Sequence, residues 1–339
     1  MNPDYDASKP HHTPQGFRNT APTPQKTSAE FFRWRRERRD LVVPPPVADL
    51  SPVKPDLRFI HANRDAFAVT WIGHATALVQ LDGVNFLTDP HFSERASPVQ
   101  ILGPKRWQAP GVRVEDLPHI DVVLLSHNHY DHLDAGSVAR LRRQRGGPPL
   151  FLVPLGLDRW MSGAGVKRVR KMDWWDRTEV NGATVTFVPS QHWSRRTLAD
   201  TNTTLWGGYV VQADSQSFYF AGDTGYGPDF KEIGARFGGF DLSLLPIGAY
   251  EPRWFMKAAH VNPEEAVRIH REVRSRRTVA IHWGTFSLTD EPLDRPLDDL
   301  AAARARHRLA LGEFVTLRHG ETLKLHPDLR HSEAGQRPR

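Results

Sequence analysis

The stretch Ser126-His127-Asn128-His129-Tyr130-Asp131-His132-Leu133-Asp134 decides the fold, because it gathers three histidines and a carboxylate within six residues. It directly follows the apolar run Val122–Leu125, which predicts a buried strand. Neutral imidazole and carboxylate oxygen are natural ligands of zinc and similar divalent ions. Positions 127 and 129 project alike from an extended segment, and positions 131 and 132 lie beyond it, where the loop turns. Two adjacent clusters in one loop can therefore face two different ions.

Three further candidate ligands occupy the same place relative to a predicted strand. His192 follows an apolar run, and so do Asp223 and His282. Loops at strand ends, held by a rigid sheet, are where functional sites are built. For any single histidine, a surface or hydrogen-bonded core position is the favoured alternative. Four such coincidences are hard to explain by packing, because so many polar groups beside buried strands need a partner such as a metal.

The pattern around this loop predicts the layers of the fold. Asp82-Gly83 is a two-residue hairpin signal. Asp134 caps a helix to about residue 143, and Asn262 with Glu265 forms a capping box that starts another, to about residue 274. A terminal helix is expected over Pro296–Leu311. Strands come first, with hairpins, and helices are interspersed later. This order favours an α+β sandwich of two β-sheets between helical layers over a parallel doubly wound sheet.

The chain divides into three parts. Residues 1–65 are predicted to be an N-terminal extension, residues 66–325 the catalytic domain and residues 326–339 a frayed tail. Within the extension, residues 1–28 are polar and rich in proline, histidine and threonine, which predicts an extended arm. Residues 31–39 are basic and aromatic.

Composition narrows the chemistry. The 339-residue chain has no cysteines, so disulfides and thiolate metal sites are excluded, but it has 17 histidines. Its net charge of +6 favours an anionic partner such as phosphate or a lipid surface, although the same charge also serves solubility. No apolar run reaches the roughly 18 residues of a membrane span, and the N-terminus lacks a signal-peptide pattern. A cytoplasmic location, peripheral on the inner membrane face, is expected.

Several motifs resemble the metallo-β-lactamase superfamily and, within it, the N-acylphosphatidylethanolamine-hydrolysing phospholipase D family. The superfamily resemblance rests on His-x-His-x-Asp-His with a later His, Asp and His. The narrower resemblance covers roughly residues 60–320 and is most specific from Gly248 to Gly284. The motifs that carry it are Trp71-Ile72-Gly73-His74-Ala75-Thr76, Leu87-Thr88-Asp89-Pro90, Gly103-Pro104-Lys105-Arg106, Pro189-Ser190-Gln191-His192-Trp193, Ala221-Gly222-Asp223-Thr224-Gly225-Tyr226, Ile247-Gly248-Ala249-Tyr250-Glu251-Pro252-Arg253-Trp254-Phe255-Met256 and Ile281-His282-Trp283-Gly284-Thr285.

This resemblance implies a metallo-β-lactamase αββα sandwich with two metal ions. Zinc is the ion that the fold implies, and iron or manganese would fit the same nitrogen and oxygen ligands. The resemblance assigns the first ion to His127, His129 and His192, the second to Asp131, His132 and His282, and a bridging position to Asp223.

The resemblance also implies roles around the ions. Asp131, Asp223 and His260 are predicted to be catalytic, with His260 a substrate contact or proton donor. Asp89 is expected to hydrogen-bond a ligand imidazole and so fix its tautomer. His74 is expected to act in the same way, although a buried histidine that only satisfies backbone groups is an equal alternative.

An aromatic and apolar cluster is predicted to contact the substrate. It contains Tyr250, Trp254, Phe255 and Met256, followed by Lys257. In a lipid enzyme such a cluster lines an acyl channel or touches the bilayer. Ordinary core packing is the alternative, because a run of large apolar residues usually packs.

The predicted reaction is phospholipase D-type hydrolysis of N-acylphosphatidylethanolamine to N-acylethanolamine and phosphatidic acid, by a hydroxide that bridges the two metals. One alternative is a related hydrolase of another phosphodiester or a lactone, and a less favoured one is a non-catalytic lipid-binding protein. The predicted partners are a phospholipid substrate and an anionic membrane, contacted through residues 31–39 unless these pack on the domain. A homodimer is left open. No nucleic acid is expected, because no extended basic, aromatic groove is evident.

Overall fold

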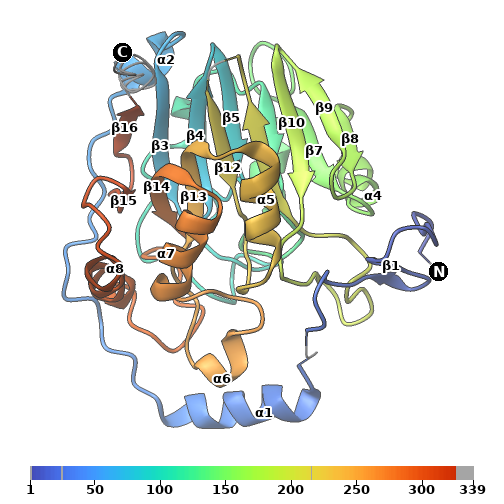
Figure 1. Cartoon of the computed structure of the whole chain (residues 1–339), viewed down its shortest axis with the longest axis vertical. Helices are drawn as coiled ribbons and strands as arrows, with labels where there is room; N and C mark the ends of the chain where they lie inside the picture. Colours follow the sequence, from blue (N-terminus) through green and yellow to red (C-terminus); the bar gives the residue numbers. More distant parts are fainter. Residues whose placement is uncertain (1, 24–25, 215, 326–339) are drawn as a thin grey trace, which may run out of the picture.

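The computed structural model describes residues 2–23, 26–214 and 216–325, so the predicted tail at 326–339 lies outside the described residues. Two mixed seven-stranded β-sheets pack face to face, with helices on their outer faces (Figure 1). The expected α+β sandwich is therefore confirmed. Among the described residues, no helix is long and apolar enough to cross a membrane.

The first sheet combines a hairpin-built half with a parallel half. Its strands lie in the order β16 (Thr322–Leu325), β3 (Phe67–Gly73), β4 (Thr76–Leu81), β5 (Val84–Thr88), β6 (Val122–Leu124), β7 (Leu150–Pro154) and β8 (Val169–Met172). Pairing is antiparallel from β16 to β5 and parallel from β5 to β8. Asp82 and Gly83 join β4 to β5 with φ angles of 46° and 76°, the positive values that a type I′ hairpin requires.

The second sheet repeats this plan. Its strands lie in the order β15 (Phe314–Val315), β14 (Ser275–Ile281), β13 (Phe240–Pro246), β12 (Ser217–Phe220), β11 (Gly208–Gln212), β10 (Ala183–Val188) and β9 (Arg177–Val180). Pairing is parallel from β12 to β15 and antiparallel from β9 to β12. Both sheets thus place the carboxyl ends of several parallel strands at one edge.

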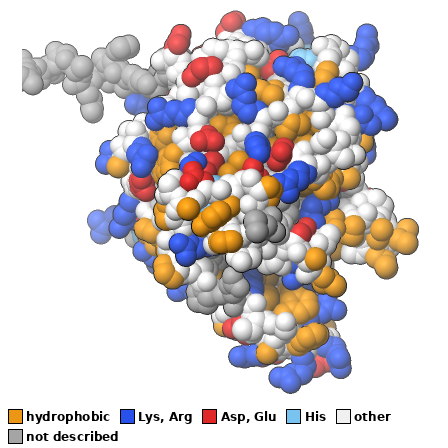
Figure 2. Space-filling view, turned by 90° about the vertical axis from the view of Figure 1, so that its right-hand side faces the viewer, with side chains coloured by type: hydrophobic (Ala, Val, Ile, Leu, Met, Phe, Trp, Pro, Cys, Tyr) orange, Lys and Arg blue, Asp and Glu red, His pale blue; other side chains and the backbone are white. Residues whose placement is uncertain are grey.

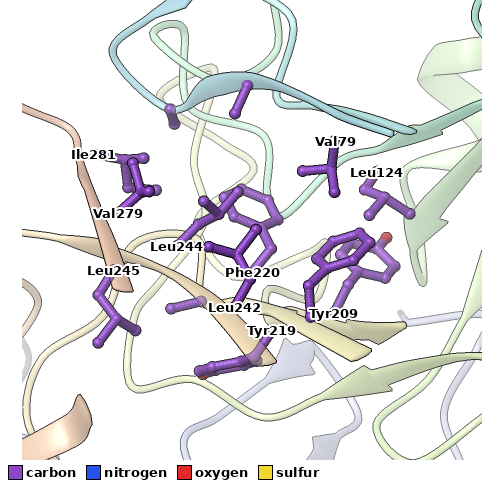
Figure 3. Packing of buried hydrophobic residues seen from close by; sticks show 14 of the residues in the cluster. Val79, Leu124, Tyr209, Tyr219, Phe220, Leu242, Leu244, Leu245, Val279 and Ile281 are labelled. Carbon is purple, nitrogen blue, oxygen red and sulfur yellow. The ribbon is translucent and has the colours of Figure 1, made fainter. Parts of the chain in front are cut away.

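The main core lies between the sheets, where apolar side chains of both inner faces meet (Figure 3). Val79 and Leu124 of the first sheet belong to this cluster together with Phe220 and Leu244 of the second. The buried Tyr209 hydroxyl lies 2.9 Å from the carbonyl oxygens of Leu125 and of Leu152, so it links β11 to the first sheet. The loop that follows β6 is therefore anchored to both sheets where it begins.

Helices cover the outer faces as the capping signals predict. The first sheet is covered by α2 (Leu57–Ala62), α3 (Ala135–Leu141) and α4 (Asp158–Gly163), and the second by α5 (Asp229–Phe237), α7 (Pro263–Glu272) and α8 (Arg295–Arg306). Asp134 caps α3, and Asn262 with Glu265 forms the capping box of α7. The expected length of the terminal helix is wrong, because the chain leaves the helix after Arg306 and Arg308 has a left-handed φ of 52°.

The N-terminal extension differs from the expected extended arm. Strands β1 (His12–Thr13) and β2 (Gly16–Phe17) form a small hairpin with the side chains of His11, His12 and Phe17 buried. The hairpin docks on the residue that follows β8: Asp173 accepts hydrogen bonds from Lys9, from His11 Nε2 at 2.7 Å and from His12 Nε2 at 3.0 Å. We call this group the Asp173 latch.

The extension continues along the lower edge of the molecule. Helix α1 (Ser28–Glu37) lies beside the short α6 (Arg253–Met256), and Trp34 stacks on Phe255 with ring centroids 5.0 Å apart (Figure 1). Two single-turn 3-10 helices, Arg38–Asp40 and Val114–Asp116, complete the elements.

Because Asp173 is buried in the Asp173 latch, removal of the negative charge of Asp173 should lower the stability of the folded protein. Burial opposes ionisation of Asp173, but His11 and Lys9 hold its pKa well below the ordinary 3.8. A lowered carboxyl pKa stabilises the folded state above pH 3.8, and this contribution is lost as the pH falls from there through the pKa of the folded state. Asp173→Asn should lower the free energy of unfolding by about 3 kcal/mol at pH 7, the scale for a broken buried ion pair.

Urea denaturation of both proteins at pH 7 and pH 3 measures this difference, which should be smaller at pH 3. Hydrogen exchange should at the same time show faster exchange of the β1–β2 hairpin in the variant. Equal stabilities at pH 7 would mean that the hairpin docks without help from Asp173.

Candidate metal centre

The candidate ligands converge at the edge where strands of both sheets end. His127 follows β6, His192 follows β10, Asp223 follows β12 and His282 follows β14. The loops approach closely there: a Cβ at Gly222, whose φ is 62°, would lie 2.6 Å from the Cβ of Ser126. Glycine is therefore required beside Asp223, because any side chain would push the two sheets apart at the site.

One group of nitrogens gathers around His129. His127 Nε2 lies 2.8 Å and His192 Nε2 3.2 Å from His129 Nδ1. The ligand atoms of these three residues all lie within 4.8 Å of one another. Neutral imidazole nitrogens that face each other with their lone pairs repel, and a cation placed among them removes that repulsion.

A second group gathers around Asp131. Its Oδ2 lies 3.3 Å from His132 Nε2, 3.4 Å from His282 Nε2 and 3.0 Å from His74 Nε2. The structure therefore places His74 directly against a candidate ligand, where it donates to the carboxylate. This contact favours a role for His74 at the site over the alternative that His74 only hydrogen-bonds to backbone groups.

Asp223 lies between the two groups. Its Oδ2 is 3.1 Å from His132 Nε2 and 3.9 Å from His192 Nε2, and its Oδ1 is 3.2 Å from His282 Nε2. The contact between His282 and Asp223 lacks hydrogen-bond geometry, although both atoms are buried. These nitrogen and oxygen atoms fit a divalent cation, because a cation can bind the lone pairs of atoms that lie close together without forming a hydrogen bond to each other.

Hydrogen bonds behind the ligands fix which nitrogen faces the centre. Asp89 Oδ2 accepts from His132 Nδ1 at 2.7 Å, and Asp89 Oδ1 accepts from the amide of Ser126 at 2.7 Å. His192 Nδ1 donates to the carbonyl of Ala259 at 2.9 Å. In both histidines Nε2 is left to face the centre, which is the arrangement expected of metal ligands and the partners that orient them.

Burial and neighbouring charges set the protonation of the centre. Burial lowers the pKa of His129 and of His192 to about 3, so both are neutral at pH 7. Burial acts the same way on His282, but the Asp223 carboxylate raises its pKa to about 9. Asp223 also helps to raise the pKa of His132 well above its usual value against the effect of burial. A cation bound by His132 and His282 must therefore displace protons, whereas the group around His129 presents neutral nitrogens.

His260 stands at the open side of the centre. Its Nδ1 lies 3.8 Å from Asp223 Oδ2 and has no hydrogen-bond partner among the described residues. Its ring is 5.2 Å from that of His192 and 5.7 Å from that of His282. Burial, above all, lowers the pKa of His260 well below its usual value, so the ring is neutral at pH 7.

The centre opens into a cavity of about 1400 Å³. Its floor includes His129, His192 and His260, and its walls include aromatic side chains of α1 and α6. Residues 8–11, 18–23 and 26–28 of the extension form a further wall. The arm is thus part of the site, which its polar composition does not predict.

The expected substrate cluster is only partly at this cavity. Phe255 and Met256 line it, whereas Tyr250, Trp254 and Lys257 are not among the described lining residues. The Tyr250 hydroxyl points to α8 and donates to Asp299 Oδ2 at 2.5 Å. Trp254 stacks under Arg33 at 4.2 Å, and Lys257 is exposed. The substrate contact expected of Tyr250, Trp254 and Lys257 therefore stays a prediction, for which the lining of this cavity gives no support.

Two residues that the sequence does not mark as functional hydrogen-bond to the backbone of loops that carry candidate ligands. Arg196 Nη1 donates to the carbonyls of Asn128 and Leu133 at 2.8 Å each, and so brackets the ligand loop. Asn19 pairs with the backbone of His192, donating to its carbonyl at 2.9 Å and accepting from its amide at 3.1 Å. No local pattern marks either residue, because each acts across a long sequence separation.

The Asp173 latch also contains two histidines and a carboxylate close together. Its polar atoms satisfy one another and Lys9, however, and none of them is among the buried unpartnered atoms of the described residues. The lysine ammonium occupies a place beside the carboxylate that a cation would need. We therefore interpret this group as a structural latch.

Comparison with known proteins gives consistent results. The family model described as Beta-lactamase superfamily domain matches residues 84–283. The chain is 45% identical over 274 residues to N-acyl-phosphatidylethanolamine-hydrolyzing phospholipase D 1 of Caenorhabditis elegans, which covers 77% of this chain and 76% of that protein. It is 37% identical over 238 residues to the mitochondrial N-acyl-phosphatidylethanolamine-hydrolyzing phospholipase D of Saccharomyces cerevisiae, covering 68% of this chain and 50% of that one.

A solved structure supports the fold. The metallo hydrolase Igni18 of Ignicoccus hospitalis superposes with a TM-score of 0.58 at 20% identity, covering 77% of this chain and 99% of that one. Fold, ligand groups and family match define a metal-dependent hydrolase, and the chain belongs to the metallo-β-lactamase superfamily. Within that superfamily it resembles the N-acylphosphatidylethanolamine-hydrolysing phospholipases D.

The contacts of Asn19 predict a role in metal retention. Asn19→Ala removes both hydrogen bonds to the His192 backbone and a third, 2.9 Å bond from the Trp206 indole. Loss of a group that orients a ligand typically lowers metal affinity about 10- to 100-fold. Competition with a chromogenic chelator should show such a loss for one class of bound ion.

Arg18→Ala is the matched control, because Arg18 lies one residue earlier on the arm and its exposed side chain donates to the carbonyl of Pro10, away from the candidate ligands. It should retain wild-type metal affinity. An Asn19→Ala protein with unchanged affinity would show that the loop of His192 is held by the second sheet alone.

Proposed function

We propose that this protein is a dinuclear metal-dependent phosphodiesterase that hydrolyses N-acylphosphatidylethanolamine to N-acylethanolamine and phosphatidic acid. The observation that carries the proposal is the position of the ligand groups at the floor of a large cavity with aromatic walls. A diester with long acyl chains needs both features at once. The named activity of the 45% identical relative supports the same reaction.

The proposed ligands follow the two groups of side chains. His127, His129 and His192 would hold the first ion, Asp131, His132 and His282 would hold the second, and Asp223 would contact both. Zinc is the proposed ion, since imidazole and carboxylate are its usual ligands without cysteine, and iron or manganese would fit the same atoms. When bound, two divalent ions supply Lewis acidity and lower the pKa of water to near neutral.

His260 is the proposed proton-transfer residue. It is neutral at pH 7, lines the cavity and carries an unpartnered Nδ1 that points towards Asp223. A neutral imidazole can donate a proton through one nitrogen and accept through the other. It therefore suits the release of the alcohol product, whose oxygen must gain a proton.

The cavity suits acyl chains. Ligand sites for small molecules usually enclose about 300–1000 Å³, and this cavity is larger, at about 1400 Å³. Each buried methylene contributes about 0.8 kcal/mol to binding, so the aromatic side chains of α1 and α6 provide a reason for lipid preference.

Helix α1 is the proposed membrane contact beside the cavity. It buries Trp34 against α6 but leaves Phe31 41% and Phe32 68% exposed, next to exposed arginines. The lower end of the molecule, where α1 lies, shows hydrophobic side chains among basic ones (Figure 2). Apolar side chains enter the headgroup region, and each nearby basic residue adds about 1 kcal/mol on an anionic surface.

The reaction can be tested by its products and by the position of labelled oxygen. Purified metal-loaded protein with N-acylphosphatidylethanolamine in ¹⁸O-water should release N-acylethanolamine, with the label in phosphatidic acid. Attack at phosphorus requires this distribution, because the P–O bond to the ethanolamine oxygen is the one that breaks.

Asp223→Asn is the inactive control, since an amide between the two groups carries no negative charge. Label in the ethanolamine product would mean carbon–oxygen cleavage, and diacylglycerol would mean that the other ester is broken. Turnover of a lactone or another phosphodiester in place of the lipid would support the alternative hydrolase.

Membrane contact can be tested without deleting the arm, which also carries Asn19. Arg35→Glu/Arg36→Glu reverses two exposed charges on α1. The variant should cosediment with phosphatidylserine vesicles at least tenfold less than wild type, because four units of charge are changed near an anionic surface. Hydrolysis of a soluble short-chain diester should be unaffected.

Arg143→Glu/Arg145→Glu, which follows α3, is the matched control with the same change in net charge. It should cosediment like wild type. If both double variants lose binding equally, net charge rather than α1 attracts the protein to the vesicle.

A further inference from the structure

Lys26 is a cation of the arm that lies inside the catalytic cavity. It lines the same cavity as His129, His192 and His260. Its ammonium is 3.7 Å from Met256 Sδ and 4.1 Å from the centre of the Phe255 ring. Among the described residues, no carboxylate forms an ion pair with it, so the charge is held by apolar and aromatic neighbours.

Such a cation is costly to bury without an anion. Burial lowers the pKa of Lys26 to about 8, even though Glu30 on α1 acts in the opposite direction. The contact with the Phe255 ring offsets only part of the lost hydration, since cation–π contacts contribute about 0.5–2 kcal/mol. An anion that enters the cavity would restore the missing charge partner.

The other lysine and arginine residues that line the cavity are either paired or exposed to solvent. Lys9 is paired with Asp173 in the Asp173 latch. Arg18 and Arg195 are exposed, so water can solvate their charges. Among the described lining residues, Lys26 is therefore the partly buried lysine or arginine that no carboxylate pairs with.

Lys26 also lies beside the segment that carries His260. Met256, whose Sδ contacts the ammonium, accepts a hydrogen bond from the amide of His260 through its carbonyl at 2.9 Å. A ligand that contacts His260 in this cavity is therefore expected to lie near Lys26 as well.

We propose that Lys26 binds a non-bridging phosphoryl oxygen of the substrate, so that the N-terminal arm supplies the cation that selects anionic phosphodiesters. This inference rests on the proposed function and names a residue that determines its substrate class. A phosphodiester carries one negative charge at neutral pH, and an ammonium donates charge-assisted hydrogen bonds to its oxygens. A lactone or carboxylic ester carries no such charge and gains nothing from Lys26.

The experiment compares wild type with Lys26→Met, Lys26→Gln and Lys26→Arg, all metal-loaded. Methionine keeps an unbranched apolar side chain against Phe255, glutamine keeps polarity, and arginine keeps the charge. The first readout is binding of inorganic phosphate by isothermal titration calorimetry. The second is kcat/KM for a soluble short-chain phosphodiester and for an uncharged ester of similar size.

We expect phosphate to bind about tenfold more weakly to Lys26→Met and Lys26→Gln, and within about threefold of wild type to Lys26→Arg, the scale of one charge-assisted hydrogen bond. The kcat/KM for the diester should fall at least in parallel. Any turnover of the neutral ester should be unchanged. Metal content and thermal midpoint are measured for every variant, so that a loss of folding is recognised.

The outcomes separate this inference from the proposed function. If wild type fails to cleave N-acylphosphatidylethanolamine while Lys26→Met still weakens phosphate binding, the proposed reaction is wrong and the anion site stands. If the lipid is cleaved and both neutral variants bind phosphate like wild type, Lys26 only packs on Phe255 and the inference is overturned. Equal losses for the diester and the neutral ester would overturn it too.

Discussion

The carboxylate of Asp223 is the group on which the rest of the centre depends. It stands at the end of β12 in the second sheet, yet it lies 3.1 Å from His132, which belongs to a loop of the first sheet. It also reaches His282 from β14 and so joins both ligand groups. Buried charge needs compensation, and here the compensation comes from across the sandwich. Gly222 permits this contact, because a Cβ there would lie 2.6 Å from the Cβ of Ser126 in the loop that follows β6.

The sequence predicts those features of the structure that depend on residues close together in the chain. A buried strand followed at once by three histidines and a carboxylate needs only neighbouring residues to be recognised, and the capping box at Asn262 is equally local. Their positions after predicted strands, together with motif resemblance, add the distant candidate ligands His192, Asp223 and His282, and the structure brings these side chains together. The two-sheet architecture follows from the order of hairpins and helices.

The rest is not predictable in this way, because it arises between segments far apart in the chain. Asn19 and Lys26 lie in a polar stretch whose composition predicts an extended arm, and their contacts with His192 and Met256 form only in the folded chain. The orientation of Tyr250 and Trp254 is likewise not predictable from the sequence. Their apolar character marks burial or packing, but which way each points is decided by Asp299 and Arg33, residues that no local pattern connects to them.

The arm has a consequence for the order in which the site is assembled. Lys9 meets Asp173 across 164 positions, and Asn19 meets His192 across 173. Such distant contacts form late in folding, because long loops must close first. The ribosome adds about 5–20 residues per second, so the arm is synthesised at least several seconds before Asp173 and His192. In that interval Phe31 and Phe32 have no cavity to line, and such exposed apolar side chains favour aggregation of the nascent chain. The cavity thus gains one of its walls from residues that are synthesised before both sheets of the sandwich.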